Sequence, residues 1–89
     1  MRIEVQVFAW LKDLVGKPSL TVELDPSQAT AAGLLAAVTA TLQDRETFPA
    51  DLAVRLSTCK VAVNEAYADL TSPISAADEI ALIPPVSGG

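Results

Sequence analysis

The sequence predicts an α+β fold in which a mixed sheet of about five strands carries one main helix across one face. Two observations favour this fold. Segments near the beginning of the chain alternate apolar and polar residues, whereas a stretch in the middle repeats its apolar residues at helical spacing. Short apolar runs follow that helix and are typical of further strands. An order of two strands, one helix and then more strands indicates a helix packed on a single sheet.

The first two strands are predicted from alternation. Apolar residues occupy every second position over residues 3–9, and the same pattern returns over residues 20–24. Residues 11–16 between them are expected to form a short turn that ends at glycine. The two strands then form a hairpin with an elaborated loop.

The main helix is predicted over residues 30–42. Asp25-Pro26-Ser27 ends the second strand, and Thr30 is a suitable N-cap. Gly33 weakens the helix by about 1 kcal/mol relative to alanine, so packing rather than propensity must stabilise it. The apolar residues that form its buried stripe are Ala31, Leu34, Leu35, Val38 and Leu42.

The second half of the chain begins with a less regular region. Residues 43–57 show no clear period, and a short helix is expected near residues 51–56. Alternation over residues 59–63 predicts a third strand. A tight turn at residues 64 and 65 then leads into a short fourth strand over residues 66–68.

The last strand is predicted over residues 79–83. This run is apolar on both faces, which fits a central strand that is covered on both sides. With the first and last strands side by side at the centre, the arrangement is a β-grasp. We expect a β-grasp domain over residues 1–83 and an extended tail over residues 84–89. A tail that starts from a central strand has a rigid base and loses less entropy when a partner binds it.

The composition excludes several functional classes. The chain has 89 residues and a formal net charge of −5, which disfavours nucleic-acid binding and favours a basic partner surface. It contains no histidine and one cysteine, Cys59, so the usual zinc sites, catalytic Ser-His or Cys-His pairs and an internal disulfide are excluded. We expect no bound metal. No apolar run approaches the roughly 20 residues that span a bilayer, and no secretory apolar segment begins the chain, so we expect a cytoplasmic protein without a membrane partner.

The final residues, Pro84-Pro85-Val86-Ser87-Gly88-Gly89, indicate where chemistry takes place. Proline cannot continue a sheet ladder, so this segment should leave the fold extended, with a reach of about 20 Å at ~3.3 Å per residue. Glycine has no Cβ and can enter a slot too narrow for any other residue. We expect the carboxylate of Gly89 to be the reactive group, carried by an inserting segment made of Pro84, Pro85, Val86, Ser87 and Gly88. The alternative is an ordinary frayed chain end.

Three parts of the chain carry a resemblance to a known family: Val7-Phe8-Ala9 with residues 11–16, then Val63-Asn64, and residues 78–89. With them the chain resembles the ubiquitin-like β-grasp sulfur carriers, and within these the small subunits of molybdopterin synthases. The resemblance spans nearly the whole chain. Two positions depart from the family pattern, because Ala77 stands where a glycine is usual and Ile83 where many relatives have an aromatic residue. If the turn at Ala77 needs a positive φ, it is strained.

The resemblance implies a role for Gly89. A ubiquitin-activating-like adenylyltransferase uses ATP to convert its carboxylate into an acyl-adenylate, and a sulfur donor protein then makes the thiocarboxylate. The tail enters the large subunit of the synthase and gives its sulfur to a pterin precursor for the molybdenum cofactor. The implied protein is thus the sulfur-donating subunit of a heterotetrameric sulfurtransferase, with no permanently bound cofactor.

An apolar docking patch for the large subunit is predicted on the sheet face away from the helix. Phe8, Tyr67 and Ile83 should meet there, and contiguous exposed apolar surface usually marks an interface. The alternative is that residues 43–57 fold over this face and cover it.

Other residues have two interpretations each. Trp10 either lies at the rim of the same interface or packs beneath the neighbouring turn. Lys12 and Lys60 either pair with acidic groups of a partner or remain solvated. Cys59 is favoured as a small core residue over a sulfur relay. Asp78 and the next residue point to opposite faces, so they serve the turn rather than form an acid–base pair.

Three other functions would use the same fold. A ubiquitin-like protein modifier would form isopeptide-linked conjugates with lysines of other proteins. A sulfur carrier for thiazole or cysteine synthesis would use the same tail, although Pro84-Pro85 and the patch around Phe8 argue against it. A simple binding module would tolerate substitution of both terminal glycines.

Overall fold

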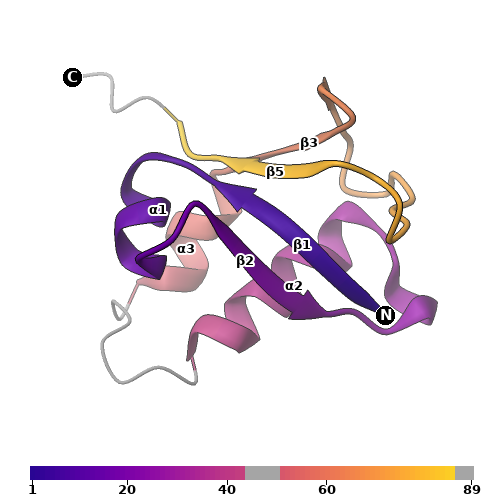
Figure 1. The fold of residues 1–89 in the computed structure, drawn as a ribbon, viewed down its shortest axis with the longest axis horizontal. Coiled ribbons are helices and arrows are strands. Elements are labelled where there is room, and N and C mark those ends of the chain that lie inside the picture. The colour runs from indigo at the N-terminus through magenta and orange to yellow at the C-terminus, as the bar shows by residue number, and fades with distance from the viewer. Residues whose placement is uncertain (44–50, 86–89) are drawn as a thin grey trace.

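The computed structural model describes residues 1–43 and 51–85. Its helices and strands, in chain order, are β1 (Arg2–Val7), α1 (Ala9–Val15), β2 (Ser19–Glu23), a short 3₁₀ helix (Pro26–Gln28), α2 (Ala31–Gln43), α3 (Leu52–Ser57), β3 (Lys60–Val63), β4 (Ala66–Tyr67) and β5 (Ile80–Ile83). Figure 1 shows α2 and α3 on one side of the sheet and α1 at the end where β1 stops. None of the helices in these two stretches is long and apolar enough to cross a bilayer.

The strands form one mixed sheet in the order β2-β1-β5-β3-β4. At its centre β1 and β5 run parallel, with Val5 opposite Ile80. Antiparallel pairing continues on both sides, from β1 to β2, where Ile3 lies opposite Val22, and from β5 to β3. The predicted β-grasp arrangement, with the first and last strands adjacent, is therefore confirmed.

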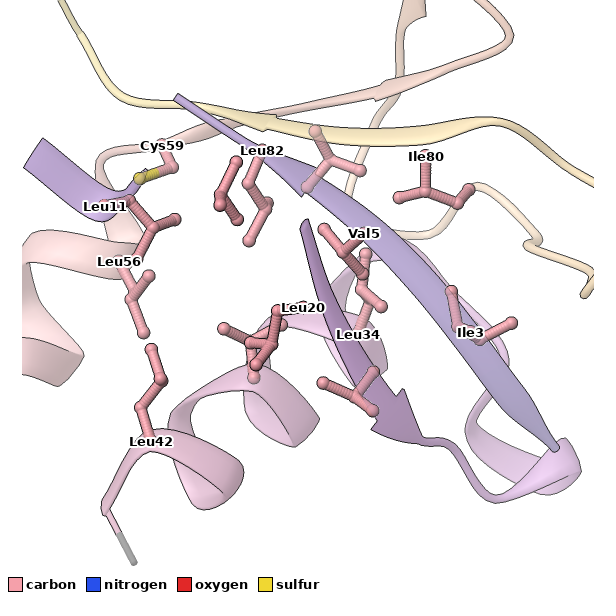
Figure 2. Close-up of a cluster of buried hydrophobic side chains, with 14 of the residues drawn as sticks. Ile3, Val5, Leu11, Leu20, Leu34, Leu42, Leu56, Cys59, Ile80 and Leu82 are labelled. Atoms are coloured by element: carbon pink, nitrogen blue, oxygen red, sulfur yellow. The ribbon is translucent and has the colours of Figure 1, made fainter. Parts of the chain in front are cut away.

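One apolar core fills the space between the sheet and the helices (Figure 2). Every second residue of β1 points into it, and Figure 2 shows Leu42 of α2 directed toward Leu56 of α3. Both leucines are at most 1% exposed. Burying a leucine of this kind contributes about 1.5–3 kcal/mol to folding. The fold is therefore stabilised mainly by aliphatic side chains packed on one face of the sheet.

The connection between the first two strands is a helix, and the predicted turn was wrong. The first strand ends at Val7 rather than at Ala9, and α1 follows directly. Leu11 and Val15 lie one helical turn apart, and both are buried in the core. Gly16 ends α1 with φ of 81°, a left-handed C-cap. A helix of seven residues is too short to be stable alone, so burial against the end of the sheet decides its conformation.

The loop between β4 and β5 accepts hydrogen bonds from the first backbone N–H groups of α2. The backbone N–H groups of Ala31 and Ala32 donate hydrogen bonds to the carbonyl oxygens of Ser72 and Leu70, at 3.0 and 2.9 Å. The first N–H groups of a helix have no acceptor within the helix itself. This loop supplies acceptors for them and joins α2 to the segment that precedes β5.

Gly33 has a structural role that its low helix propensity conceals. A Cβ atom at this position would lie 1.9 Å from the carbonyl oxygen of Gln28, which belongs to the 3₁₀ helix. Only glycine permits this close approach. The Gly33 N–H also donates to Thr30 Oγ1 at 3.2 Å, which confirms Thr30 as the predicted capping residue.

Candidate docking surface and terminal strand

The two faces of β5 have different environments. Ile80 and Leu82 point into the core and are at most 1% exposed, whereas Ala81 and Ile83 are only partly buried. The central position predicted for this strand is correct, but among the described residues no helix covers its second face. Alanine and isoleucine there form part of an open apolar surface.

The terminal segment begins at the end of β5. Pro84 is buried and Pro85 is exposed, so the chain leaves the sheet surface between these two residues. In Figure 1 this point lies at the same end of the sheet as α1. The other residues predicted to insert into a partner, and the predicted reactive residue, lie outside the described part of the chain: Val86, Ser87, Gly88 and Gly89.

A groove of about 310 Å³ lies on the sheet face opposite the helices. The structure brings together Phe8, Tyr67 and Ile83 in it, as the sequence predicted for the docking patch. Phe8 is 44% exposed and Tyr67 72% exposed, which is high for large apolar rings. The full set of lining residues is Gln6, Phe8, Ala62, Glu65, Tyr67, Glu79, Ala81 and Ile83.

Strand register explains how these residues share one face. Ala62 of β3 pairs with Ala81 of β5 on one side and with Tyr67 of β4 on the other. Gln6 of β1 pairs with Ala81 from the opposite direction. Because residues directly opposite in a sheet point to the same side, the two alanines form a flat floor. The larger side chains then stand around it.

The region predicted as an alternative cover for this face begins at residue 43, and its described part packs elsewhere. Leu52 and Leu56 of α3 are buried in the core cluster with α2, on the other side of the sheet. Residues 51–57 therefore do not cover the groove. Residues 44–50 lie outside the described part.

Charged groups at the groove are mostly acidic. Glu65 and Glu79 line it, and Glu4 lines an adjoining hollow that shares Gln6 and Phe8 with the groove. Lys12 is the cation of that second hollow. A partner that fits this surface needs an apolar centre flanked by basic groups, because like charges placed opposite each other would repel.

Trp10 is not part of this groove. Its ring packs partly buried against the core, and the guanidinium carbon of Arg55 lies 5.7 Å from the ring centroid. This is a cation–π contact between α1 and α3. Trp10 thus packs within the fold, against Arg55 of α3, and its place at the rim of a partner interface stays a prediction.

The turn between β3 and β4 has an unusual backbone that the sequence indicated only in outline. Asn64 and Glu65 both have positive φ, 53° and 71°, as the type I′ hairpin turn requires. The Asn64 side chain donates from Nδ2 to Asp78 Oδ1 at 3.1 Å and accepts at Oδ1 from the Glu79 N–H at 2.9 Å. Sequence analysis missed this link, although an asparagine in a tight turn was the available signal.

Asp78 serves the turn before β5, as predicted. The Ser75 N–H donates to its carboxylate at 2.8 Å and, together with the amide of Asn64, holds the pKa of Asp78 below its usual value. The residues with positive φ in the described segments are Ala9, Gly16, Asn64 and Glu65. Ala77 is not among them, so the strain considered for it is absent.

Cys59 occupies a core position, in agreement with the favoured interpretation. It is 7% exposed, and loss of water around the thiol raises its pKa above the usual value. A thiol of this kind stays neutral and is a poor nucleophile. Within residues 1–43 and 51–85, no group of three or more histidine, cysteine or acidic side chains is placed to hold a metal ion.

The fold, the open sheet face and the terminal glycines define a small β-grasp protein of the ubiquitin-like kind. The model of the ThiS family matches residues 5–89, and the chain belongs to this family. The resemblance found in the sequence is thus confirmed. The chain is also 44% identical to the molybdopterin synthase sulfur carrier subunit of Aedes aegypti, over 100% of this chain and 90% of that protein.

Two solved structures extend the comparison. SAMP1 from Haloferax volcanii, a small archaeal modifier protein, has a TM-score of 0.71 and 31% identity, with 100% of both chains covered. A protein–protein complex of subunits 1 and 2 of the molybdopterin-converting factor from Helicobacter pylori contains a chain with a TM-score of 0.56 and 29% identity, also with 100% of both chains covered. This chain is therefore similar both to a small modifier protein and to a subunit of a protein–protein complex.

Proposed function

We propose that this chain is the sulfur carrier subunit of a molybdopterin synthase and that the Gly89 carboxylate carries the sulfur as a thiocarboxylate. The observation that carries the proposal is the full-length similarity to the Aedes aegypti subunit. The family match supports it because it extends through Gly89. The position of β5 supports it too, because this central strand leads directly into Pro84 and the terminal segment.

The proposed chemistry takes place at one carbon atom. A carboxylate is a poor electrophile, and transfer of AMP from ATP, with release of pyrophosphate, gives it a good leaving group. Sulfide supplied by a donor protein then attacks the same carbon, the bond to AMP breaks, and a thiocarboxylate and free AMP are left. ATP belongs to the activating adenylyltransferase, and this chain holds no permanent cofactor. We place these reactions in the cytoplasm, where Cys59 stays reduced.

The contribution of the fold is delivery and positioning. A reactive atom held at a fixed place in a partner gains a large rate advantage over one that diffuses freely. The prolines at the base of the tail restrict its conformations before binding, which lowers the entropy lost on insertion. The tail that carries the Gly89 carboxylate therefore has fewer conformations to lose when it enters the partner.

The proposed partner is the large subunit of the synthase. The complex of the two Helicobacter pylori subunits supports an assembly of this kind. We place its docking site on the groove that Phe8, Tyr67 and Ile83 line, with Lys12 in the adjoining hollow. Ile83 lines the groove and directly precedes Pro84, so docking there would also set the direction in which the tail enters the partner.

A protein modifier is the second candidate, favoured by the likeness to SAMP1. Both functions need an activated terminal glycine, so the groove and tail alone do not separate them. Isopeptide-linked conjugates of this chain in lysates of its own cells would support the modifier. A stable complex with a large pterin-binding subunit would support the sulfur carrier.

The decisive measurement is the intact mass of the chain purified, without a C-terminal tag, from its own cells. We expect a fraction whose mass increase equals the exchange of one terminal oxygen for sulfur. Deleting Gly89 should abolish this fraction and sulfur transfer to the pterin precursor, while the far-ultraviolet circular dichroism spectrum stays unchanged. Sulfur transfer by the truncated chain would contradict the proposal.

A further inference from the structure

We infer that Asn64 is a positioning residue for the docking groove: its side chain holds the β3–β4 hairpin, and with it Tyr67, against the turn that leads into β5. The inference rests on the proposed function, because it takes the large subunit as the occupant of the groove. Tyr67 touches the partner in this account. Asn64 acts only through the position of Tyr67.

The β3–β4 hairpin forms one wall of the groove, and few contacts hold this wall in place. β4 is two residues long and lies at the edge of the sheet, paired with β3 through two positions. One further backbone bond joins the Ala68 N–H to the Val61 carbonyl oxygen at 2.8 Å. Tyr67 is 72% exposed, so burial of its ring contributes little. An edge pairing this short has few bonds, so a further contact to the hairpin contributes to holding Tyr67 in place.

Asn64 supplies this contact with three hydrogen bonds to two consecutive residues. Its Nδ2 donates to Asp78 Oδ1 at 3.1 Å, and its Oδ1 accepts from the Glu79 N–H at 2.9 Å. Its backbone N–H donates to the Glu79 carbonyl oxygen at 2.8 Å. Asp78 is held in turn by the Ser75 N–H, at 2.8 Å from Oδ2. The hairpin is thus tied to a turn that is itself braced.

These bonds connect opposite parts of the groove. Glu65 and Tyr67 line it from the hairpin, and Glu79 lines it from the segment entering β5. Asn64 begins the turn of the hairpin that carries Tyr67 and is bonded to Glu79, so its side chain sets how far Tyr67 stands from the β5 side of the groove. Loss of the bonds would leave the wall in several positions, and the partner would have to select one of them. A binding surface that must be ordered on binding has a lower affinity.

The backbone of Asn64 makes a clean variant available. Its φ of 53° is one that glycine adopts without strain. Asn64→Gly therefore keeps the turn and removes the two side-chain hydrogen bonds. Asp25→Ala is the matched control, because Asp25 also loses an exposed side-chain bond to a backbone N–H, that of Ser27 at 2.9 Å, but does not line the groove.

The test measures the Kd of the full chain for the purified large subunit of molybdopterin synthase from the same organism, by isothermal titration calorimetry. We expect Asn64→Gly to weaken binding by about five- to tenfold, the scale of one or two net hydrogen bonds. Asp25→Ala should bind as the unaltered chain does. In a Tyr67→Ala background, Asn64→Gly should change the Kd by less than about twofold, because no ring remains to be positioned.

Hydrogen exchange on the free protein gives a second measurement. The Ala68 amide should exchange faster in Asn64→Gly, while the amides of β1 keep their rates. An unchanged Kd, or an equal loss with and without Tyr67, would overturn the positioning role and leave the proposed function intact. If the unaltered chain does not bind the large subunit, the proposed function fails, and this inference with it.

Discussion

The two faces of the sheet differ in what they are built to do, although the same strands form both. On the helix side, Leu82 of β5 is fully buried, and so is Val7 of β1, which lies opposite it in the sheet. On the other side, Ala62 and Ala81 form a flat floor beneath the exposed ring of Tyr67. The helix side therefore carries stability and the open side is available for recognition. Adjacent residues on one strand should have separable effects.

The faces also differ in how their geometry is maintained. Close packing of aliphatic side chains orders the helix side, where every methylene has neighbours. The open side has few such contacts, and strand register with the hydrogen bonds of Asn64 orders it instead. A change in volume should damage the first face, whereas a change in hydrogen bonding should damage the second.

The largest expected effect comes from neighbouring residues of β5. Leu82→Ala should lower the free energy of unfolding by about 2–5 kcal/mol, because it leaves a cavity in a fully buried site. Ile83→Ala, on the partly buried open face, should cost about 1 kcal/mol. Urea denaturation followed by circular dichroism measures both. Equal losses would show that the two faces are equally important for stability.

The next effect concerns binding through the open face. Phe8→Ala should raise the Kd for the large subunit by about thirtyfold, the scale of an interface hot spot, with little change in stability. Val54→Ala is the control, since Val54 is also exposed, at 68%, but lies on α3 on the other side of the sheet. Unchanged binding by Phe8→Ala would place the docking site elsewhere.

Gly33→Ala tests packing on the helix side, because packing and helix propensity predict opposite changes in the free energy of unfolding. Helix propensity favours alanine by about 1 kcal/mol. The new Cβ would lie 1.9 Å from the Gln28 carbonyl oxygen, so the 3₁₀ helix must move. We expect a net loss of about 1–2 kcal/mol in the free energy of unfolding. Ala36→Gly, at an exposed position of α2, should lose about 1 kcal/mol through propensity alone. A gain in stability for Gly33→Ala would contradict this account.

The smallest effect is a pH dependence at the braced turn. Hydrogen bonds from the Ser75 N–H and the Asn64 amide lower the pKa of Asp78 below its usual value of 3.8. Folding therefore favours the charged carboxylate, and the stabilisation is present above pH 3.8 and is lost as the pH falls through the folded-state pKa. Asp78→Asn should be less stable than the unaltered chain at pH 7, and the difference should shrink toward pH 2. A difference that stays constant with pH would contradict the assignment.

Local pattern alone was enough to predict the main elements. Strict alternation located β1, β2 and β3, because a half-buried strand exposes every second residue to water. The apolar stripe and Thr30 located α2, and the apolar run before Pro84 located the central strand. The meeting of Phe8, Tyr67 and Ile83 on one sheet face was also predictable, since strand order and alternation determine which residues share a face.

Contacts between distant segments decided the rest. Helix α1 forms because Leu11 and Val15 are buried in the core at the end of the sheet. Its seven residues are too few for helix propensity alone to predict it. Gly33 meets Gln28 because the 3₁₀ helix packs on the first turn of α2, and Asn64 meets Asp78 only when two separate loops are brought together. Short-range periodicity and residue type were enough to specify the five strands, helix α2, the core face and the segment with the terminal glycines. Helix α1, the open second face of β5 and the bracing of the groove depend on packing and hydrogen bonds between residues far apart along the chain, so no local pattern shows them.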